Sequence, residues 1–137
     1  MAVQAYLYFD GNCREAVFFY AEVFGSPAPQ IMSYGDAPPN PAFPLDEKMK
    51  KRVLHAELEV QGGKILFSDV SGSGGFLVGN NVTLYLGSKN AHELTGWYGK
   101  LKEGGTVDME LGPQFFSKLY GFVWDRFGIG WQLGLTE

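Results

Sequence analysis

Cysteine and histidine are scarce in this chain, which has one cysteine (Cys13) and two histidines (His55 and His92) among 137 residues. A single cysteine cannot form an intramolecular disulfide, so a reducing cytoplasm is the expected compartment. Cys13 opens a predicted helix, where the pKa of a thiol can be lowered. No histidine lies near it in sequence to act as a base, and we expect no redox or nucleophilic role for it.

The chain also lacks long apolar runs and an excess of positive charge. No stretch approaches the roughly 18 apolar residues of a membrane span, and no basic and apolar leader opens the chain. The net charge of −4 gives no electrostatic reason to expect nucleic acid or an anionic membrane as a partner. Apolar residues at 45% and charged residues at 19% are typical of a globular protein.

One helical signature occurs in each half of the chain. Asn12 and Asn90 are each followed three residues later by a glutamate, Glu15 and Glu93, which is the pattern of a capping box. Behind each box, apolar residues recur at the spacing of one helix face. The two sets are Ala16, Phe19, Tyr20 and Val23, and Leu94, Trp97, Tyr98 and Leu101. This repetition predicts a duplicated module.

The segments around the two helices predict the same series of strands in both halves. The first half has strand-like runs at 3–9, 30–34, 53–60 and 64–69 and a helix at 13–24. The second half has strand-like runs at 82–86, 106–111, 118–125 and 130–135 and a helix at 91–103. Residues 61–63 (Gln-Gly-Gly) are typical of a hairpin turn, whereas four prolines predict a loop at 35–51 and Pro113 predicts another.

These elements predict an α+β fold of two βαβββ modules in a single domain spanning 1–137, with module one at about 1–70 and module two at about 80–137. The Gly/Ser-rich segment 71–75 is the expected connector between them. Each module alone would leave one face of its sheet exposed. We therefore expect the modules to pair into an open eight-stranded sheet around a cleft, where a ligand would bind.

Several segments in order match one known group of proteins: Tyr6 to Cys13, Val23 to Gly25, His55 to Leu58, Leu101 to Gly105, and Tyr120 to Trp131. With them the chain resembles the vicinal-oxygen-chelate superfamily, which includes glyoxalase I, bleomycin-resistance proteins and extradiol dioxygenases. More narrowly it resembles the PhnB-like branch, also described as a 3-demethylubiquinone methyltransferase-like domain. The resemblance covers essentially the whole chain and implies paired βαβββ modules, a homodimer, and a pocket on the concave face of the sheet.

Metal-dependent members of this superfamily take one His, Gln or Glu ligand from each of four strands. To within one or two residues, the resemblance places these positions at Ala5, at Phe67 or Ser68, between Asn81 and Thr83, and at Gln132. Only Gln132 offers a plausible donor to a divalent cation. We therefore expect no metal and no other cofactor. The turns at 10–12 and 87–90 are capping turns without the Gly-rich pattern of a methyl-donor site, and methyl transfer is not expected.

Two groups of side chains are candidates for ligand binding. His55 shares a strand face with Glu57, and a neighbouring carboxylate favours the cationic form of an imidazole; the alternative is that this face is only solvated. The aromatic segment 115–131, in which Tyr120, Phe122 and Trp124 share one strand face, indicates either a ligand site or core and dimer packing. We predict no catalytic residue, and the predicted ligand-binding residues are His55, Glu57, Phe116, Trp124 and Gln132.

Three functions follow from these features. The first is metal-independent binding of an unknown small molecule by a cytoplasmic homodimer, without nucleic-acid or membrane partners. The second is an enzyme, either a metal-dependent lyase, isomerase or dioxygenase of the same superfamily or one that uses His55 and Glu57 in acid–base chemistry. The third is a structural or regulatory dimer without a ligand. Asp69 and Ser68 are expected to cap a turn, and His92 is expected to have no functional role.

Overall fold

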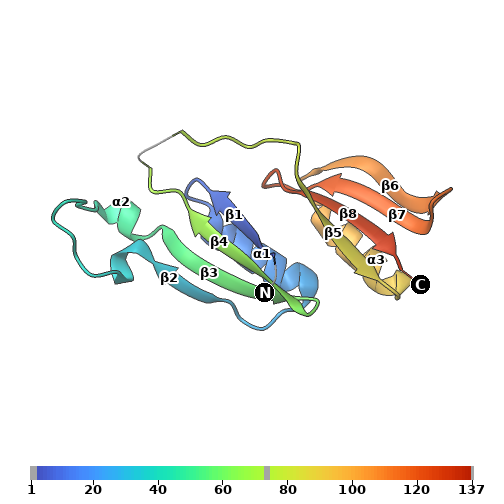
Figure 1. Ribbon diagram of the computed structural model, residues 1–137, viewed down its shortest axis with the longest axis horizontal. Coiled ribbons are helices and arrows are strands. Elements are labelled where there is room, and N and C mark those ends of the chain that lie inside the picture. Colours follow the sequence, from blue (N-terminus) through green and yellow to red (C-terminus); the bar gives the residue numbers. More distant parts are fainter. Residues whose placement is uncertain (1–2, 73–74, 137) are drawn as a thin grey trace. The chain divides into compact units, whose positions relative to one another are not determined.

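The computed structural model describes residues 3–72 and 75–136 (Figure 1). It divides into two compact units, Met1–Leu77 and Val78–Glu137. The first unit contains β1 (Ala5–Phe9), α1 (Cys13–Phe24), β2 (Gln30–Ser33), η1 (Tyr34–Asp36), α2 (Glu47–Lys50), β3 (Val53–Val60) and β4 (Gly63–Asp69). The second contains β5 (Thr83–Ser88), α3 (Ala91–Leu101), β6 (Thr106–Gln114), β7 (Ser117–Trp124) and β8 (Gly130–Leu135).

Each unit forms one four-stranded mixed sheet, and the two sheets have the same topology. The strand orders are β1-β4-β3-β2 and β5-β8-β7-β6. In each sheet the first strand runs parallel to its neighbour, β4 or β8, and all other neighbours are antiparallel. The predicted α+β fold and its duplicated βαβββ modules are therefore confirmed.

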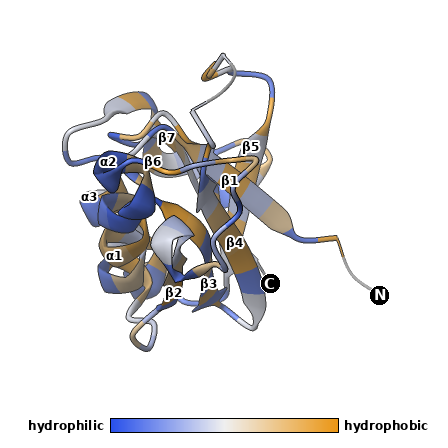
Figure 2. Ribbon diagram, turned by 90° about the vertical axis from the view of Figure 1, so that its left-hand side faces the viewer, coloured by the Kyte–Doolittle hydropathy of each residue, from blue (hydrophilic) through white to orange (hydrophobic). Residues whose placement is uncertain are grey.

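One helix covers one face of each sheet. α1 packs against β3 and β4, and α3 packs against β5, β7 and β8 (Figure 1). In the first unit the centroid of the Tyr20 ring on α1 lies 5.9 Å from that of Phe67 on β4. Hydrophobic residues occupy the middle of β4 (Figure 2). In the second unit Leu94 and Leu101 are fully buried, as are Val123 and Leu133 on the sheet. The face opposite the helix is called the open face of each sheet below.

The predicted capping box at the first helix is wrong. Asn12 makes no capping bond with its side chain, and its backbone is not extended. The carboxylate of Asp69, at the end of β4, takes this role because its Oδ1 accepts hydrogen bonds from the amides of Gly11 at 2.7 Å and Cys13 at 3.1 Å. Asp69 thus has the capping role expected for it, but it caps the start of a helix rather than a turn of its own strand.

The second helix is capped by the predicted asparagine. Oδ1 of Asn90 accepts from the amides of His92 at 2.9 Å and Glu93 at 3.2 Å. The glutamate reaches the cap through a third residue, because the Ser88 hydroxyl donates to Glu93 and accepts from the amide of Asn90. The predicted bond from the asparagine side chain is therefore confirmed, whereas the predicted bond from the glutamate to the cap residue runs through Ser88.

This difference between the helices predicts unequal effects of two matched substitutions. Asn90→Ala removes a capping oxygen and is expected to lower the free energy of unfolding by about 0.5–2 kcal/mol. Asn12→Ala removes no such bond and is expected to change it by less than about 0.5 kcal/mol. Urea unfolding of both variants checks this, and equal losses would show that the cap at α1 has been misassigned.

The structure also corrects the two loops predicted at 35–51 and at Pro113. Segment 35–51 contains the end of η1 and the whole of α2. The Asp46 side chain caps α2 by accepting a hydrogen bond from the amide of Met49. β6 continues through Pro113, which an edge strand tolerates because its outer side needs no donor. Residues 115–116 then form the tight turn into β7. Of the connector 71–75, residues 73–74 lie outside the described part.

Within residues 3–72 and 75–136, no helix has the length and apolar character needed to cross a membrane.

Candidate functional site

Aromatic rings cover much of the open face of the second sheet. Tyr120, Phe122 and Trp124 alternate along β7, and their partners in the register lie on β8. The ring centroids of Phe122 and Trp124 are 5.2 Å apart. Tyr85 of β5 lies on the same face, opposite Gln132, and is 60% exposed. We call these four rings, together with Phe116, the aromatic platform.

Two glycines of β8 create the space in which the platform rings lie. A Cβ atom at Gly130 would come within 2.6 Å of the Trp124 ring, and one at Gly134 would collide with the hydroxyl of Tyr85. Any larger residue at these positions would lift the rings from the sheet. The glycines therefore let both aromatic side chains rest against the backbone of β8.

Gln132 is the polar group at the centre of the platform. Its Oε1 accepts a hydrogen bond from the Tyr120 hydroxyl, and its Nε2 donates to Oγ1 of Thr83 at 3.0 Å. Burial, followed by the nearby Tyr85 and Asp108, raises the pKa of Tyr120, which therefore remains a donor at neutral pH. The two bonds fix the orientation of the Gln132 amide. A primary amide has two N–H donors, and a ligand could accept the second.

Phe116 extends the platform at the β6–β7 turn. Its ring makes an edge contact with Tyr120 at 4.9 Å between centroids, and it is 55% exposed. Its neighbour Phe115 is almost wholly exposed and contacts Phe116 edge to face. The two rings together form an exposed apolar patch at the hairpin tip.

The open face of the first sheet is more polar. Nδ1 of His55 lies 3.0 Å from the Tyr6 hydroxyl, and its Nε2 lies 3.3 Å from Oε1 of Glu57. Nζ of Lys64 lies 3.4 Å from the other oxygen of Glu57. The bond from His55, and then Lys64, hold the pKa of Glu57 below its usual value. Tyr6, His55, Glu57 and Lys64 therefore form a continuous polar line across three strands.

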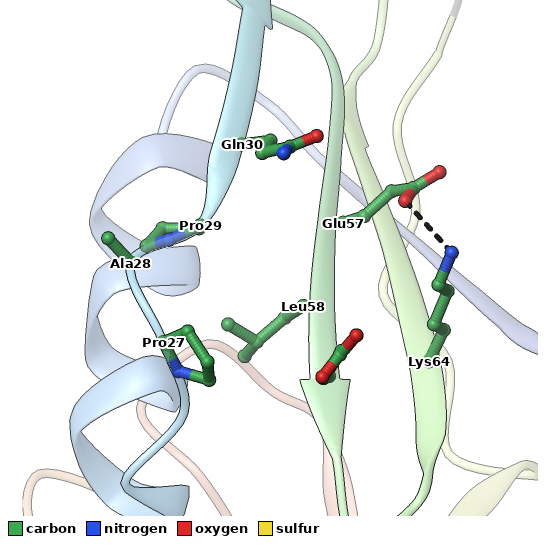
Figure 3. A pocket seen from close by; sticks show the side chains of 8 residues that line it. Pro27, Ala28, Pro29, Gln30, Glu57, Leu58 and Lys64 are labelled. Carbon is green, nitrogen blue, oxygen red and sulfur yellow. Dashed lines mark hydrogen bonds and ion pairs between the residues drawn. The ribbon is translucent and has the colours of Figure 1, made fainter.

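A small pocket of about 250 Å³ lies at the edge of this sheet (Figure 3). Its apolar side consists of Pro27, Pro29 and Leu58, and its polar side carries Gln30 and the Glu57–Lys64 ion pair. Sequence reasoning missed this pocket, although two prolines separated by one residue just before a strand are a recognisable signal of an extended, rigid segment.

The structure separates the predicted ligand-binding residues into two sets. His55 and Glu57 contact each other on the first sheet. On the second sheet, Phe116 contacts Tyr120, which donates to Gln132, and Trp124 lies on the same face. Sequence reasoning missed other partners in each set, which are Tyr6 on the first sheet and Thr83 and Tyr85 on the second.

The structure shows where the family-derived metal positions of the first unit lie. Ala5 and Phe67 lie on the α1 side of the sheet, as does the buried Phe9. Ser68 is used by the backbone, because its hydroxyl donates to the carbonyl of Leu54 at 2.8 Å. In the described ranges 3–72 and 75–136, no three or more His, Cys, Asp or Glu side chains are grouped to hold a metal ion. Ala5, Phe67 and Ser68 therefore offer no imidazole or carboxylate to a divalent cation.

Cys13 belongs to neither open face, and the expected lowering of its pKa is wrong. Its side chain is fully buried, and this burial, together with the adjacent Asp69, raises the pKa of the thiol to about 12. The thiolate is the reactive form. We therefore expect no reaction of native protein with a disulfide reagent at pH 8 and complete reaction in urea. Rapid labelling of the folded protein would contradict the burial of Cys13.

Comparison with known proteins decides the family. Residues 1–134 match the family described as 3-demethylubiquinone-9 3-methyltransferase. The chain belongs to this family. It is 26% identical over 143 residues to Protein YjdN of Escherichia coli (strain K12), across 100% of this chain and 97% of that protein. It is 30% identical to protein PA1353 from Pseudomonas aeruginosa, whose crystal structure aligns with a TM-score of 0.87 over 98% of this chain and 97% of that one.

The wider resemblance to the glyoxalase group also holds at the level of the fold. A glyoxylase/bleomycin resistance protein/dioxygenase domain from Frankia sp. EAN1pec aligns with a TM-score of 0.67 at 14% identity, over 100% of this chain and 92% of that one. The predicted 3-demethylubiquinone methyltransferase-like branch is thereby confirmed by the family match, and the fold expected of the superfamily is shared with this domain. In this chain, the open face of the first sheet carries Tyr6, His55 and Glu57, and that of the second sheet carries the aromatic platform.

Proposed function

We propose that this protein binds a small planar molecule on the aromatic platform of its second sheet, without a metal ion. The observation that carries the proposal is the pair of glycines in β8, over which Trp124 and Tyr85 lie against the backbone. Large rings in such a position present exposed aromatic surface, as the 60% exposure of Tyr85 illustrates. Aromatic ligands stack well on surfaces of this kind.

The polar centre of the platform supports the same proposal. Small-molecule sites usually combine apolar walls with a few directed polar groups. Gln132 is held in one orientation by Tyr120 and Thr83, so its second N–H would select a ligand with a hydrogen-bond acceptor beside its planar ring. A surface used only for packing would not need an amide fixed at both ends.

The alternative is a metal-dependent lyase, isomerase or dioxygenase-type enzyme of the same superfamily. Such chemistry requires imidazole or carboxylate ligands. The family-derived positions here carry Ala5, Phe67 or Ser68, a residue between Asn81 and Thr83, and Gln132, and this donor set supports metal-independent binding. We also propose that His55 and Glu57 bind a ligand from the first sheet.

We further propose a homodimer in the cytoplasm, with no nucleic-acid partner. β6 is an edge strand, and the phenylalanines that follow it at 115–116 are exposed, as expected of a surface that contacts a second copy. The net charge of −4 opposes binding to nucleic acid. Sedimentation equilibrium would test the dimer, and a monomer at micromolar concentration would contradict it.

Substitutions on the platform test the proposed binding. Two-ring aromatic compounds such as quinoline are titrated into the protein and followed by isothermal calorimetry. Compounds that bind are expected to weaken about tenfold or more in Trp124→Ala, Phe116→Ala and Gln132→Ala, since each removes a stacking surface or a buried hydrogen bond. Tyr8→Phe, on the first sheet, serves as the control and is expected to bind normally. Unchanged affinity in all three variants would place the binding site elsewhere.

A further inference from the structure

Three side chains on the open face of the first sheet form a directed hydrogen-bond chain. Tyr6 comes from β1, and His55 and Glu57 come from alternate positions of β3. The two bonds measure 3.0 Å from the Tyr6 hydroxyl to Nδ1 of His55 and 3.3 Å from Nε2 of His55 to Glu57. The two nitrogens of one imidazole thus contact a phenol on one side and a carboxylate on the other.

The carboxylate of Glu57 determines which groups donate and which accept in these hydrogen bonds. Glu57 is ionised at neutral pH, since His55 and Lys64 hold its pKa below the usual value, and an ionised carboxylate can only accept hydrogen bonds. A neutral His55 must therefore carry its proton on Nε2, which leaves Nδ1 as an acceptor. The Tyr6 hydroxyl then donates to Nδ1, and its oxygen keeps its lone pairs for another molecule.

We propose that Tyr6, His55 and Glu57 form a proton-accepting site for small molecules with an acidic hydroxyl group, that is, phenols or enols. The ligand O–H bond breaks, and its electron pair stays on the ligand oxygen. The released proton passes to the oxygen of Tyr6 while the proton of Tyr6 passes to Nδ1 of His55. The ligand remains as an oxyanion that accepts from Tyr6, and His55 becomes an imidazolium ion bonded to Glu57.

The side chains beside Tyr6 and His55 offer an apolar surface on which a phenol or an enol could lie. Tyr8 stacks against Tyr6 with ring centroids 5.3 Å apart and an interplanar angle of 15°, and it is 55% exposed. A planar ligand could lie on Tyr8 with its hydroxyl at Tyr6. Met32 of β2 pairs with His55 and adds an apolar edge.

Charged and titratable groups also lie around the hydrogen-bond chain of Tyr6, His55 and Glu57. Lys64 of β4 binds Glu57, and Glu59 lies further along β3 on the same face. Burial, with further contributions from Tyr8, Tyr34 and Cys13, raises the pKa of Tyr6. Tyr6 therefore keeps its proton at rest and acts by passing it on, as a hydroxyl does when an adjacent base accepts its proton. This site does not depend on the aromatic platform of the second sheet.

Binding of 4-nitrophenol tests the proposal, because its anion absorbs visible light and the neutral phenol does not. The probe is titrated into the protein at a pH equal to its own pKa, where half of the free probe is the anion and the wild type is expected to hold about nine-tenths or more of the bound probe as the anion. Tyr6→Phe and His55→Gln are expected to abolish this excess absorbance. Tyr98→Phe, in α3, is the matched control, since it also removes one hydroxyl and keeps the ring, and it is expected to retain the signal.

The tautomer of His55 gives a second measurement that needs no ligand. Nitrogen-15 NMR at pH 8.5 is expected to show the proton on Nε2 of His55, and His92→Gln identifies the signals of the other histidine. Glu57→Gln is expected to shift the proton towards Nδ1, because an amide can donate to Nε2. Failure of 4-nitrophenol to bind, binding as the neutral phenol, equal signals in Tyr6→Phe and Tyr98→Phe, or a proton on Nδ1 in the wild type would each overturn the proposal. These measurements test only the site on the first sheet, and the quinoline titration tests the aromatic platform separately.

Discussion

Replacing Asp69 by alanine is expected to lower the free energy of unfolding by about 3–5 kcal/mol, because it leaves several buried amides without an acceptor. Asp69 is 1% exposed. Its Oδ1 accepts from Gly11 and Cys13, and its Oδ2 accepts from the amide of Val53 at 2.9 Å. One carboxylate thus joins the start of α1, the start of β3 and the end of β4.

Denaturant unfolding measures this effect, and two other variants calibrate it. Asp69→Asn keeps an oxygen of similar size but replaces the second acceptor with a donor, so its loss is expected to fall below that of Asp69→Ala. Asp10→Ala removes an exposed carboxylate that pairs with Arg52, and a loss below about 1 kcal/mol is expected. If Asp69→Ala lost no more than Asp10→Ala, the carboxylate would not hold these elements together.

Gly130→Ala is expected to destabilise the second unit and to disturb the aromatic platform. The new methyl group would lie 2.6 Å from the Trp124 ring and 2.8 Å from Cγ2 of Thr83. Overpacking of this kind costs about 1–3 kcal/mol. Since the ring must move away from β8 to relieve the contact, any compound that stacks on Trp124 is expected to lose about tenfold or more in affinity.

A second glycine provides the control for the added methyl group. Gly96 lies in α3 with nothing within 4 Å of a built Cβ, and Gly96→Ala is expected to stabilise the protein by about 0.5–1 kcal/mol through helix propensity. Thermal unfolding and quinoline titration of both variants check the pair. A Gly130→Ala protein with normal stability and normal binding would show that the rings do not need the bare backbone of β8.

Local patterns in the sequence account for most of the fold. Helix spacing, the cap at Asn90 and the Gln61–Gly62 turn act over a few residues, and the structure contains all three. Gln61 and Gly62 both have positive φ, at 50° and 80°, as the favoured two-residue hairpin turn requires. Because the same series of local signals occurs in both halves, the duplicated topology could be derived before any contact was known.

The cap at α1 shows what local patterns cannot supply. Asn12 and Glu15 have the right spacing for a capping box, but Asp69 reaches the helix from 56 residues beyond Cys13 in the chain. A buried carboxylate forms stronger hydrogen bonds than an amide oxygen, so it takes the place of the local cap. The same limit explains the pKa of Cys13, since its burial depends on the sheet packed over it.

Strand alternation predicted part of each candidate site. It correctly placed His55 with Glu57, and Trp124 with Tyr120 and Phe122, on shared strand faces. It could not show that Tyr6 lies beside His55 or that Tyr85 lies opposite Gln132, because both relations depend on the register between distant strands. Nor does a glycine in a strand reveal which ring lies above it until the neighbouring strand is placed.

The most direct test of small-molecule binding on the second sheet is an NMR titration of the three tryptophan indole groups with quinoline. Trp97 and Trp131 are buried, and Nε1 of Trp131 donates to Asp125, whereas Trp124 lies on the open face. We expect the indole signal of Trp124 to move with saturation while the signals of Trp97 and Trp131 stay in place. Saturable binding that leaves the Trp124 signal unmoved would contradict the aromatic platform as the ligand site.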